Sequence, residues 1–129
     1  MKLDPDLVRD ILIEMEKQAP ESPPLNEIRS YGITFDARTK EEISEHVRLM
    51  QEGGLIQALR QPEQGGMFWS PIRMTWHGHQ YLASVQPERV YAKTKEIASK
   101  VFGSVTIETI KTAVPLALQA LLKSQGLAP

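Results

Sequence analysis

The N-terminal stretch of the chain has apolar residues at the three- and four-residue spacing of an amphipathic helix. Asp4 is a favourable N-cap residue, and Pro5 suits the first helical position because its missing amide would be unpaired there. The pattern predicts a helix to about Gln18, with an apolar face formed by Leu7, Val8, Ile11, Leu12 and Met15. The prolines of 19–24 predict an extended loop after it, and alternating residues predict a short strand near 26–35.

A second amphipathic pattern follows Thr39 and predicts a helix over 40–52. Thr39 and Glu42 have the spacing of a capping box, in which each side chain accepts a hydrogen bond from the other residue's backbone amide. Gly53 is expected to end the helix in the left-handed conformation. The buried face of this helix is predicted to consist of Ile43, Val47 and Met50.

The segments 55–60 and 67–75 have the composition of strands, and 62–66 has the composition of a turn. Together they predict a β-hairpin that resembles the wing of a winged-helix domain. A short helix is expected to begin at Thr75 or Trp76 and to end before Pro87.

Two further helical patterns occupy the C-terminal region, and Gly103-Ser104 separates them. Pro115 is expected to kink or restart the second helix because it lacks a backbone donor. The apolar run 113–122 is much shorter than the roughly 20 residues needed to cross a bilayer, so it predicts a packing helix. The apolar stripes of the two helices are Val90, Tyr91, Ile97, Ala98, Val101 and Phe102, and Ile107, Ile110, Val114, Leu118, Leu121 and Leu122.

This order of elements predicts a mainly helical α+β fold. Residues 1–86 are expected to form a winged-helix-like domain, because a helix that ends in Gly-Gly-Leu-Ile is followed by a hairpin and another helix. Residues 87–129 are expected to form a C-terminal helical extension. A helix with so much apolar surface must pack on the first domain or on a second copy, so the extension favours packing or a homodimer.

Composition narrows the classes of function. The chain has 129 residues, 41% of them hydrophobic, which is enough for one domain with a core. It has no cysteine, which fits a reducing compartment, and its first residues lack the pattern of a signal peptide, so a cytoplasmic location is expected. Residues 1–84 contain 9 Lys and Arg against 13 Asp and Glu, and residues 85–129 contain 6 against 3, so the expected recognition domain is the acidic part.

Three phrases of the sequence carry a resemblance to a known family. They are the opening Met1-Lys2-Leu3-Asp4-Pro5-Asp6-Leu7-Val8-Arg9, the run Glu41-Glu42-Ile43-Ser44-Glu45-His46-Val47-Arg48-Leu49-Met50-Gln51-Glu52-Gly53-Gly54-Leu55-Ile56, and Arg73-Met74-Thr75-Trp76-His77-Gly78-His79-Gln80-Tyr81-Leu82. Over residues 1 to about 100 the chain resembles a family of small bacterial and phage-encoded proteins known only as a domain of unknown function. The resemblance implies a winged-helix N-terminal part and a phage or prophage setting, and it implies no catalytic residue.

The second phrase also resembles the end of the recognition helix in bacterial winged-helix repressors, with Ser44, His46, Val47 and Met50 in comparable places. The sequence departs from repressors upstream, where prolines and a predicted strand replace a packed helix. This departure argues against a standard helix-turn-helix geometry.

The leading hypothesis is a small DNA-binding regulator or accessory protein of phage type, with helix 40–52 as its recognition helix and the hairpin 55–75 as its wing. The outward face of the helix is expected to carry Lys40, Glu41, Ser44, Glu45, Arg48 and Gln51. The predicted contacts with double-stranded DNA come from Arg38, Lys40, Ser44, Arg48, Arg60 and Arg73. Glu41 and Glu45 oppose this hypothesis, since carboxylates near phosphates weaken binding.

The alternative is a protein-interaction or dimerisation module on the same scaffold with no nucleic-acid binding, and the acidic first domain favours it. Trp69 and Trp76 could form a stacking or hot-spot surface, but core positions are the favoured interpretation for both.

The sequence contains little that indicates chemistry. His77 and His79 would lie on different faces of a helix, so surface or structural histidines are favoured over a metal site. His46 and Glu42 share one helical face and favour a local hydrogen bond. No nucleophile motif or phosphate-binding loop occurs. We therefore expect no enzyme, no cofactor, no small-molecule substrate and no membrane association.

Overall fold

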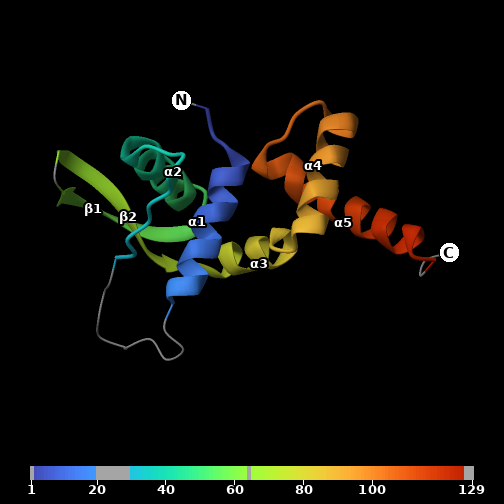
Figure 1. The fold of residues 1–129 in the computed structure, drawn as a ribbon, viewed down its shortest axis with the longest axis horizontal. Coiled ribbons are helices and arrows are strands. Elements are labelled where there is room, and N and C mark those ends of the chain that lie inside the picture. Colours follow the sequence, from blue (N-terminus) through green and yellow to red (C-terminus); the bar gives the residue numbers. More distant parts are fainter. Residues whose placement is uncertain (1, 20–29, 64, 127–129) are drawn as a thin grey trace. The chain divides into compact units, whose positions relative to one another are not determined.

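The structure is a computed structural model that describes residues 2–19, 30–63 and 65–126 (Figure 1). The predicted mainly helical α+β fold is confirmed, and the order of helix, hairpin and helix fits a winged-helix-like arrangement. Among the described residues the elements are α1 (Pro5–Gln18), α2 (Lys40–Glu52), β1 (Ile56–Glu63), β2 (Gly66–Met74), α3 (Trp76–Val85), α4 (Glu88–Phe102) and α5 (Ile107–Ser124).

The chain divides into two compact units. One unit is Asp6–Gln80, which contains most of α1 together with α2, the hairpin and the start of α3. The other consists of the residues up to Pro5 and those from Tyr81 onward. Each unit is described by itself below.

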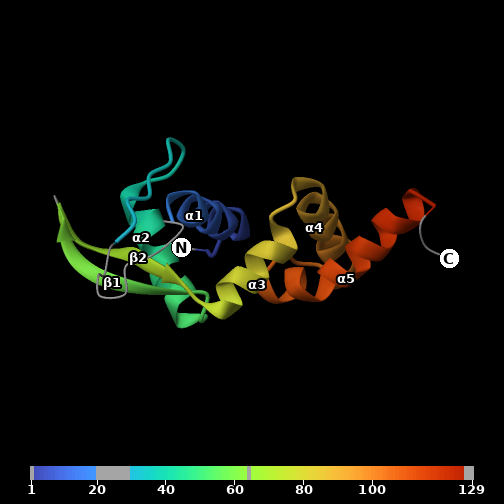
Figure 2. The same ribbon diagram turned by 90° about the horizontal axis from the view of Figure 1, so that it is seen from below.

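In the first unit, α2 packs on both strands of the hairpin, and α1 lies beside α2 (Figures 1 and 2). The strands are antiparallel, with Ile56 opposite Met74 and Glu63 opposite Gly66, and a bulge interrupts the register between Gln57 and Ala58. The predicted apolar faces are confirmed by burial: the buried apolar side chains of the two helices are Leu7, Val8, Ile11, Leu12, Met15, Ile43, Val47 and Met50.

The start of α2 is fixed as the sequence predicts. The Thr39 hydroxyl accepts a hydrogen bond from the Glu42 amide at 3.1 Å, and the Glu42 carboxylate accepts one from the Thr39 amide at 3.3 Å. The end of the helix differs from the prediction. Gly53 keeps a right-handed conformation (φ −78°), and Gly54 adopts the left-handed one (φ +81°) that glycine favours. The chain therefore reverses one residue later than expected.

The two sequence phrases on either side of the hairpin pack against each other. The Thr75 amide donates to the Leu55 carbonyl at 3.0 Å, and the Thr75 hydroxyl donates to the Gly54 carbonyl at 2.5 Å. The Gly78 amide in turn donates to the Thr75 hydroxyl at 3.1 Å, which caps the start of α3. A side chain at Gly78 would overlap the Leu55 carbonyl oxygen, so only glycine lets α3 approach the turn this closely.

The loop predicted over 19–24 and the first half of the strand predicted near 26–35 lie largely outside the described residues. The described remainder, 30–35, is not a strand, so this part of the prediction is wrong. It is extended alongside β2, where the Tyr31 amide donates to the Pro71 carbonyl at 2.8 Å. Gln18 also donates to the Gly32 carbonyl at 3.0 Å and ties the segment to the end of α1.

In the second unit, α4 and α5 pack together with a bend of 110° between them. Gly103 ends α4 in the left-handed conformation (φ +74°), and Thr106 and Thr109 form a capping box that begins α5. Pro115 was expected to kink or restart the last helix. The helix does not restart there, because α5 runs from Ile107 to Ser124 with the exposed Pro115 inside it. Taken singly, none of the described helices is long and apolar enough to cross a bilayer, and α4 and α5 pass that test only as a bent pair.

Candidate interaction surface

The two cations at the start of α2 are both engaged by carboxylates of their own unit. Lys40 Nζ lies 2.6 Å from Glu63 Oε2 at the tip of β1 and 4.6 Å from the centre of the Phe68 ring. Arg38 Nη1 lies 3.5 Å from Glu42 Oε2. These groups were predicted to meet phosphates, and in this structure Lys40 pairs with the hairpin and Arg38 with the first turn of α2.

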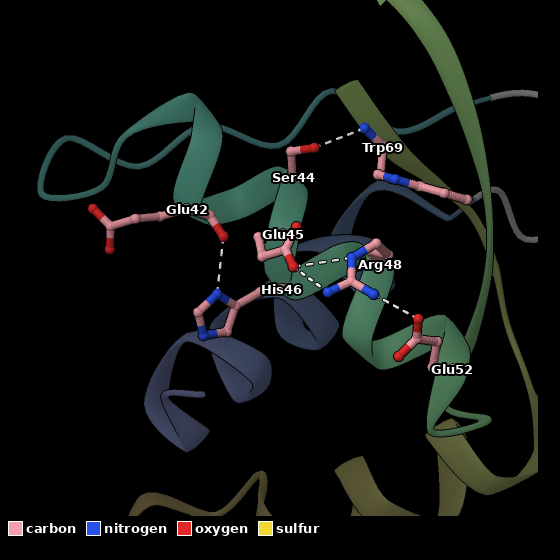
Figure 3. Close-up of polar contacts among 7 residues, drawn as sticks. All are labelled: Glu42, Ser44, Glu45, His46, Arg48, Glu52 and Trp69. Carbon is pink, nitrogen blue, oxygen red and sulfur yellow. Dashed lines mark hydrogen bonds and ion pairs between the residues drawn. The ribbon is translucent and has the colours of Figure 1, made fainter. Parts of the chain in front are cut away.

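Arg48 lies between two carboxylates on the surface of α2 (Figure 3). Its Nε donates to Glu45 Oε1 at 2.9 Å, its Nη2 forms a close ion pair with the same oxygen, and its Nη1 lies 2.5 Å from Glu52 Oε1. The hydrogen bond to Glu45 raises the pKa of Arg48, and the same bond lowers the pKa of Glu45. The guanidinium is therefore neutralised by its own helix.

The exposed surface of α2 is acidic. The helix contains Lys40 and Arg48 against four glutamates, a net charge of 2 − 4 = −2. The hydrogen bond from the Thr39 amide lowers the pKa of Glu42, which keeps this carboxylate ionised. A surface of this sign repels the phosphates of a duplex.

Ser44 and Gln51 lie on the hairpin side of α2, so the prediction that they face outward is wrong. The Ser44 hydroxyl accepts a hydrogen bond from the Trp69 amide of β2 at 2.8 Å, and Ser44 is 9% exposed (Figure 3). Gln51 Oε1 accepts one from the Ala58 amide of β1 at 2.6 Å. Each side chain satisfies a backbone donor of a strand, which explains why polar residues occupy a packed face.

His46 is buried, with 1% of its surface exposed, and its ring points toward α1 (Figure 3). Its Nδ1 lies 2.9 Å from the Glu42 carbonyl oxygen, so Nδ1 carries a proton and donates to it. The local hydrogen bond expected between positions 42 and 46 is present, and it uses the backbone oxygen of Glu42. His46 is therefore a packing residue of α2 within its unit.

The predicted wing residues have different surroundings. Arg60 and Arg73 are exposed on β1 and β2, and Arg60 lies opposite Trp69 across the hairpin. Trp69 is half-buried, whereas Trp76 is 73% exposed, so the predicted core position of Trp76 is wrong. Trp76 is the first residue of α3. The close contact between α3 and the Leu55 turn is made by Gly78 and not by the indole of Trp76.

The His77-Gly78-His79 motif has a structural role, which comes from the close packing of its glycine. Both histidines are exposed, and Gly78 between them is buried against the turn at Leu55. Within the described residues there is no group of three or more histidine and acidic side chains that could hold a metal ion. The motif is thus a packing feature at the start of α3.

A hollow of about 260 Å³ opens beside the start of α2. Its walls come from the extended segment 31–35, the start of α2 and the adjoining ends of β1 and β2. The lining combines aromatic side chains with charged ones at the edge, namely Tyr31, Phe35, Phe68 and Trp69 with Arg38, Lys40 and Glu63. Of the predicted site residues, the structure brings Arg38, Lys40 and Ser44 together here, and Arg48, Arg60 and Arg73 are not among the lining residues.

Sequence reasoning did not find this hollow. The sequence feature that could have indicated the hollow is the alternation of Tyr31, Ile33 and Phe35, which predicts one apolar side of an extended segment. All three side chains are half-buried, as that alternation indicates. Their meeting with Phe68 and Lys40 depends on tertiary packing, which the local pattern does not contain.

Comparison with known proteins identifies the family of the chain. The model of a family described as "Hypothetical protein (DUF2513)" matches residues 2–106, which include every element from α1 to α4. The chain belongs to the DUF2513 family. An uncharacterized protein of Haemophilus influenzae is 28% identical to it over 123 residues, which make up 95% of this chain and 99% of that relative. No solved structure gives a significant match.

Proposed function

We propose that this DUF2513 protein is a protein-interaction module on a winged-helix-like scaffold, and that it does not bind duplex DNA through α2. One observation carries the proposal: Arg38, Lys40 and Arg48, the cations that would meet phosphates, are each paired with a carboxylate of the same unit. Duplex binding through α2 would bring the phosphates close to the carboxylates of these pairs and to Glu41 and Glu45, and this repulsion opposes it.

The packing of α2 supports the same conclusion. A recognition helix needs a free polar face that reaches base edges. Ser44 and Gln51, which would supply such contacts, instead accept hydrogen bonds from the two strands. The side of α2 that these residues occupy is therefore used for packing on the hairpin.

A second candidate function is duplex DNA binding by other parts of the chain. It is favoured by the exposed Arg60 and Arg73 of the hairpin and by the excess of three positive charges over residues 85–129. It would place the phosphate contacts away from α2. The phage or prophage setting and the cytoplasmic location stay predictions under either function, and both functions assign no catalytic step to the chain.

Site-specific photo-crosslinking in bacterial cells tests the leading proposal. A photoreactive phenylalanine analogue is placed at Phe35, in the hollow, and at Ser99 on the exposed side of α4 as a control. We expect an adduct at Phe35 that protease removes and nuclease does not alter. An adduct at Phe35 that nuclease removes would contradict the proposal and favour a nucleic-acid partner.

A further inference from the structure

The hollow beside α2 has the composition of an anchor site. Its walls carry Tyr31, Ile33 and Phe35 on one side and Phe68 and Trp69 on the other. All of these except Phe68 are half-buried, so their apolar surface remains available to a ligand. A concave apolar surface with a few polar groups at its edge is the usual form of a binding site. The volume of about 260 Å³ suits one large side chain and the backbone beside it.

The edge of the hollow carries exchangeable positive charge. The Lys40 side chain is 47% exposed, and its ammonium group has three N–H donors, of which the Glu63 carboxylate at 2.6 Å uses only part. Glu63 is itself 33% exposed, so this pair is in contact with solvent and can be replaced at little cost. A carboxylate of a ligand can therefore share or take over the ammonium group. Arg38 lines the same hollow.

The net charge of the whole unit distinguishes two kinds of anionic ligand, a polyanion and a single carboxylate. Residues 1–84 have a net charge of 9 − 13 = −4, which opposes a polyanion along its length. A single carboxylate beside an apolar group needs only one position at the edge of the hollow, where Lys40 and Arg38 lie together with Glu63, and it can take the place of Glu63 against Lys40. The arrangement thus favours a peptide over a nucleic-acid strand.

We propose that the hollow binds an extended segment of a partner protein, with an aromatic or large apolar side chain inserted among Phe35, Phe68 and Trp69 and an adjacent carboxylate against Lys40. This inference rests on the proposed protein-interaction function and names the partner's chemistry. The aromatic side chain supplies the buried area, and the carboxylate sets the preference for acidic segments.

The test uses the full ¹⁵N-labelled chain and four defined probes. Three are capped heptapeptides: Gly-Ser-Glu-Phe-Glu-Ser-Gly, the same peptide with lysines in place of the glutamates, and the same peptide with alanine in place of phenylalanine. The fourth is a short oligothymidylate. Titrations are followed by the backbone amide signals, which report where each probe binds.

We expect the glutamate-flanked phenylalanine peptide to shift amide signals of residues 31–35 and 68–70, and the other two peptides to bind more weakly. Phe35→Ala should remove this binding, whereas Leu59→Ala, an exposed apolar residue of β1 outside the hollow, should keep it. Lys40→Gln should weaken binding about twofold to fivefold, the range of an exposed ion pair, and Arg60→Gln should not.

Two results would overturn the inference, and they separate it from the proposed function. If none of the probes shifts the signals of the hollow at millimolar concentration, the anchor site is wrong and the interaction function can lie on another face. If the oligothymidylate binds in the hollow more tightly than the peptides, both the inference and the proposed function are wrong.

Discussion

At the scale of single residues, small and polar side chains determine how the first unit is assembled. Gly78 lets α3 contact the Leu55 turn, and Thr75 links that turn to the first turn of α3. Ser44 and Gln51 attach α2 to one strand each. These residues lie within two of the three sequence phrases that carry the family resemblance, 41–56 and 73–82. The phrases therefore specify the junctions between α2, the hairpin and α3.

Replacement of Gly78 by alanine tests the close contact at the turn. The added Cβ would overlap the Leu55 carbonyl oxygen and would lie 2.7 Å from Met74 Cγ, so the backbone must shift. We expect Gly78→Ala to lower the free energy of unfolding by about 1–3 kcal/mol or more, the usual cost of overpacking. Urea denaturation measures the change. Gly32→Ala is the control, because nothing lies within 4 Å of a Cβ at that position. Equal stability of the two variants would show that α3 does not contact the turn.

Replacement of Ser44 by alanine tests the assignment of this residue to packing. The Trp69 amide would lose its acceptor, and an unsatisfied donor in a largely buried position costs about 1–3 kcal/mol. We expect Ser44→Ala to be destabilised by this amount in thermal or urea unfolding, and Ser99→Ala, at an exposed helical position, to change little. An unchanged stability together with a loss of ligand binding would return Ser44 to the recognition role.

At the scale of elements, periodicity and caps predicted the helices well. Pro5 suits the first helical position because it has no amide to leave unpaired, and the Thr39–Glu42 capping box fixes the start of α2 by hydrogen bonds, so α1 and α2 begin where the sequence predicts. The faces of these elements were less predictable. Ser44 and Gln51 are polar and were expected outside, and Trp76 is apolar and was expected inside. In each case a tertiary contact, with a strand amide or at the Leu55 turn, outweighs the general preference of the residue type.

The candidate site was predictable only in part, for the same reason. Arg38 and Lys40 were recognised as charged residues near the start of α2, but local sequence does not reveal that Glu42 and Glu63 pair with them. The Lys40–Glu63 pair connects positions 23 residues apart and depends on how the hairpin folds back toward α2. The hollow needs contributions from four separate segments, and no single periodicity describes it.

Because of the ion pairs of α2, we expect the free energy of unfolding to depend on pH in the acidic range. The pKa values of Glu42 and Glu45 are lowered from 4.5 in the folded protein, first by the Thr39 amide and the Arg48 guanidinium respectively. A lowered folded-state pKa means that the stabilising contribution is fully present above pH 4.5 and is lost as the pH falls through the lowered value. We expect Glu45→Gln to reduce the stability at neutral pH and to flatten its fall below pH 4.5 in urea titrations. Glu41→Gln is the control on the same helix, and an identical pH profile for both variants would contradict the role of the Arg48 pair.

At the scale of the whole molecule, the two units have opposite charge and different surfaces. The acidic first unit contains the hollow, and the second unit exposes apolar side chains of α4 and α5. The family model ends at residue 106, directly before α5, so the family resemblance concerns the fold up to α4. Within the described part of the second unit, the exposed large apolar residues are Val101, Phe102, Leu116, Leu118 and Leu122.

A homodimer through the C-terminal helices stays a prediction, and these exposed residues define its test. Leu118 and Leu122 are 45% and 43% exposed and lie four residues apart on one side of α5. If they pack against a second copy, Leu118→Glu should raise the dissociation constant of the dimer by about tenfold or more, because it buries a charge. Sedimentation equilibrium measures this constant. Gln119→Glu adds the same charge at a neighbouring exposed position and should have little effect, and a wild-type chain that sediments as a monomer would exclude the dimer.

The most direct test of the central claim is fluorescence anisotropy of a mixed-sequence DNA duplex titrated with the purified protein at low salt and then across a salt series. Because Arg38, Lys40 and Arg48 are paired within their unit, we predict no salt-dependent binding through α2, and no difference between the wild type and a variant with all three charges reversed. Tight binding that falls steeply with salt and disappears in the triple variant would contradict the account. It would show that these cations leave their carboxylates to contact phosphates.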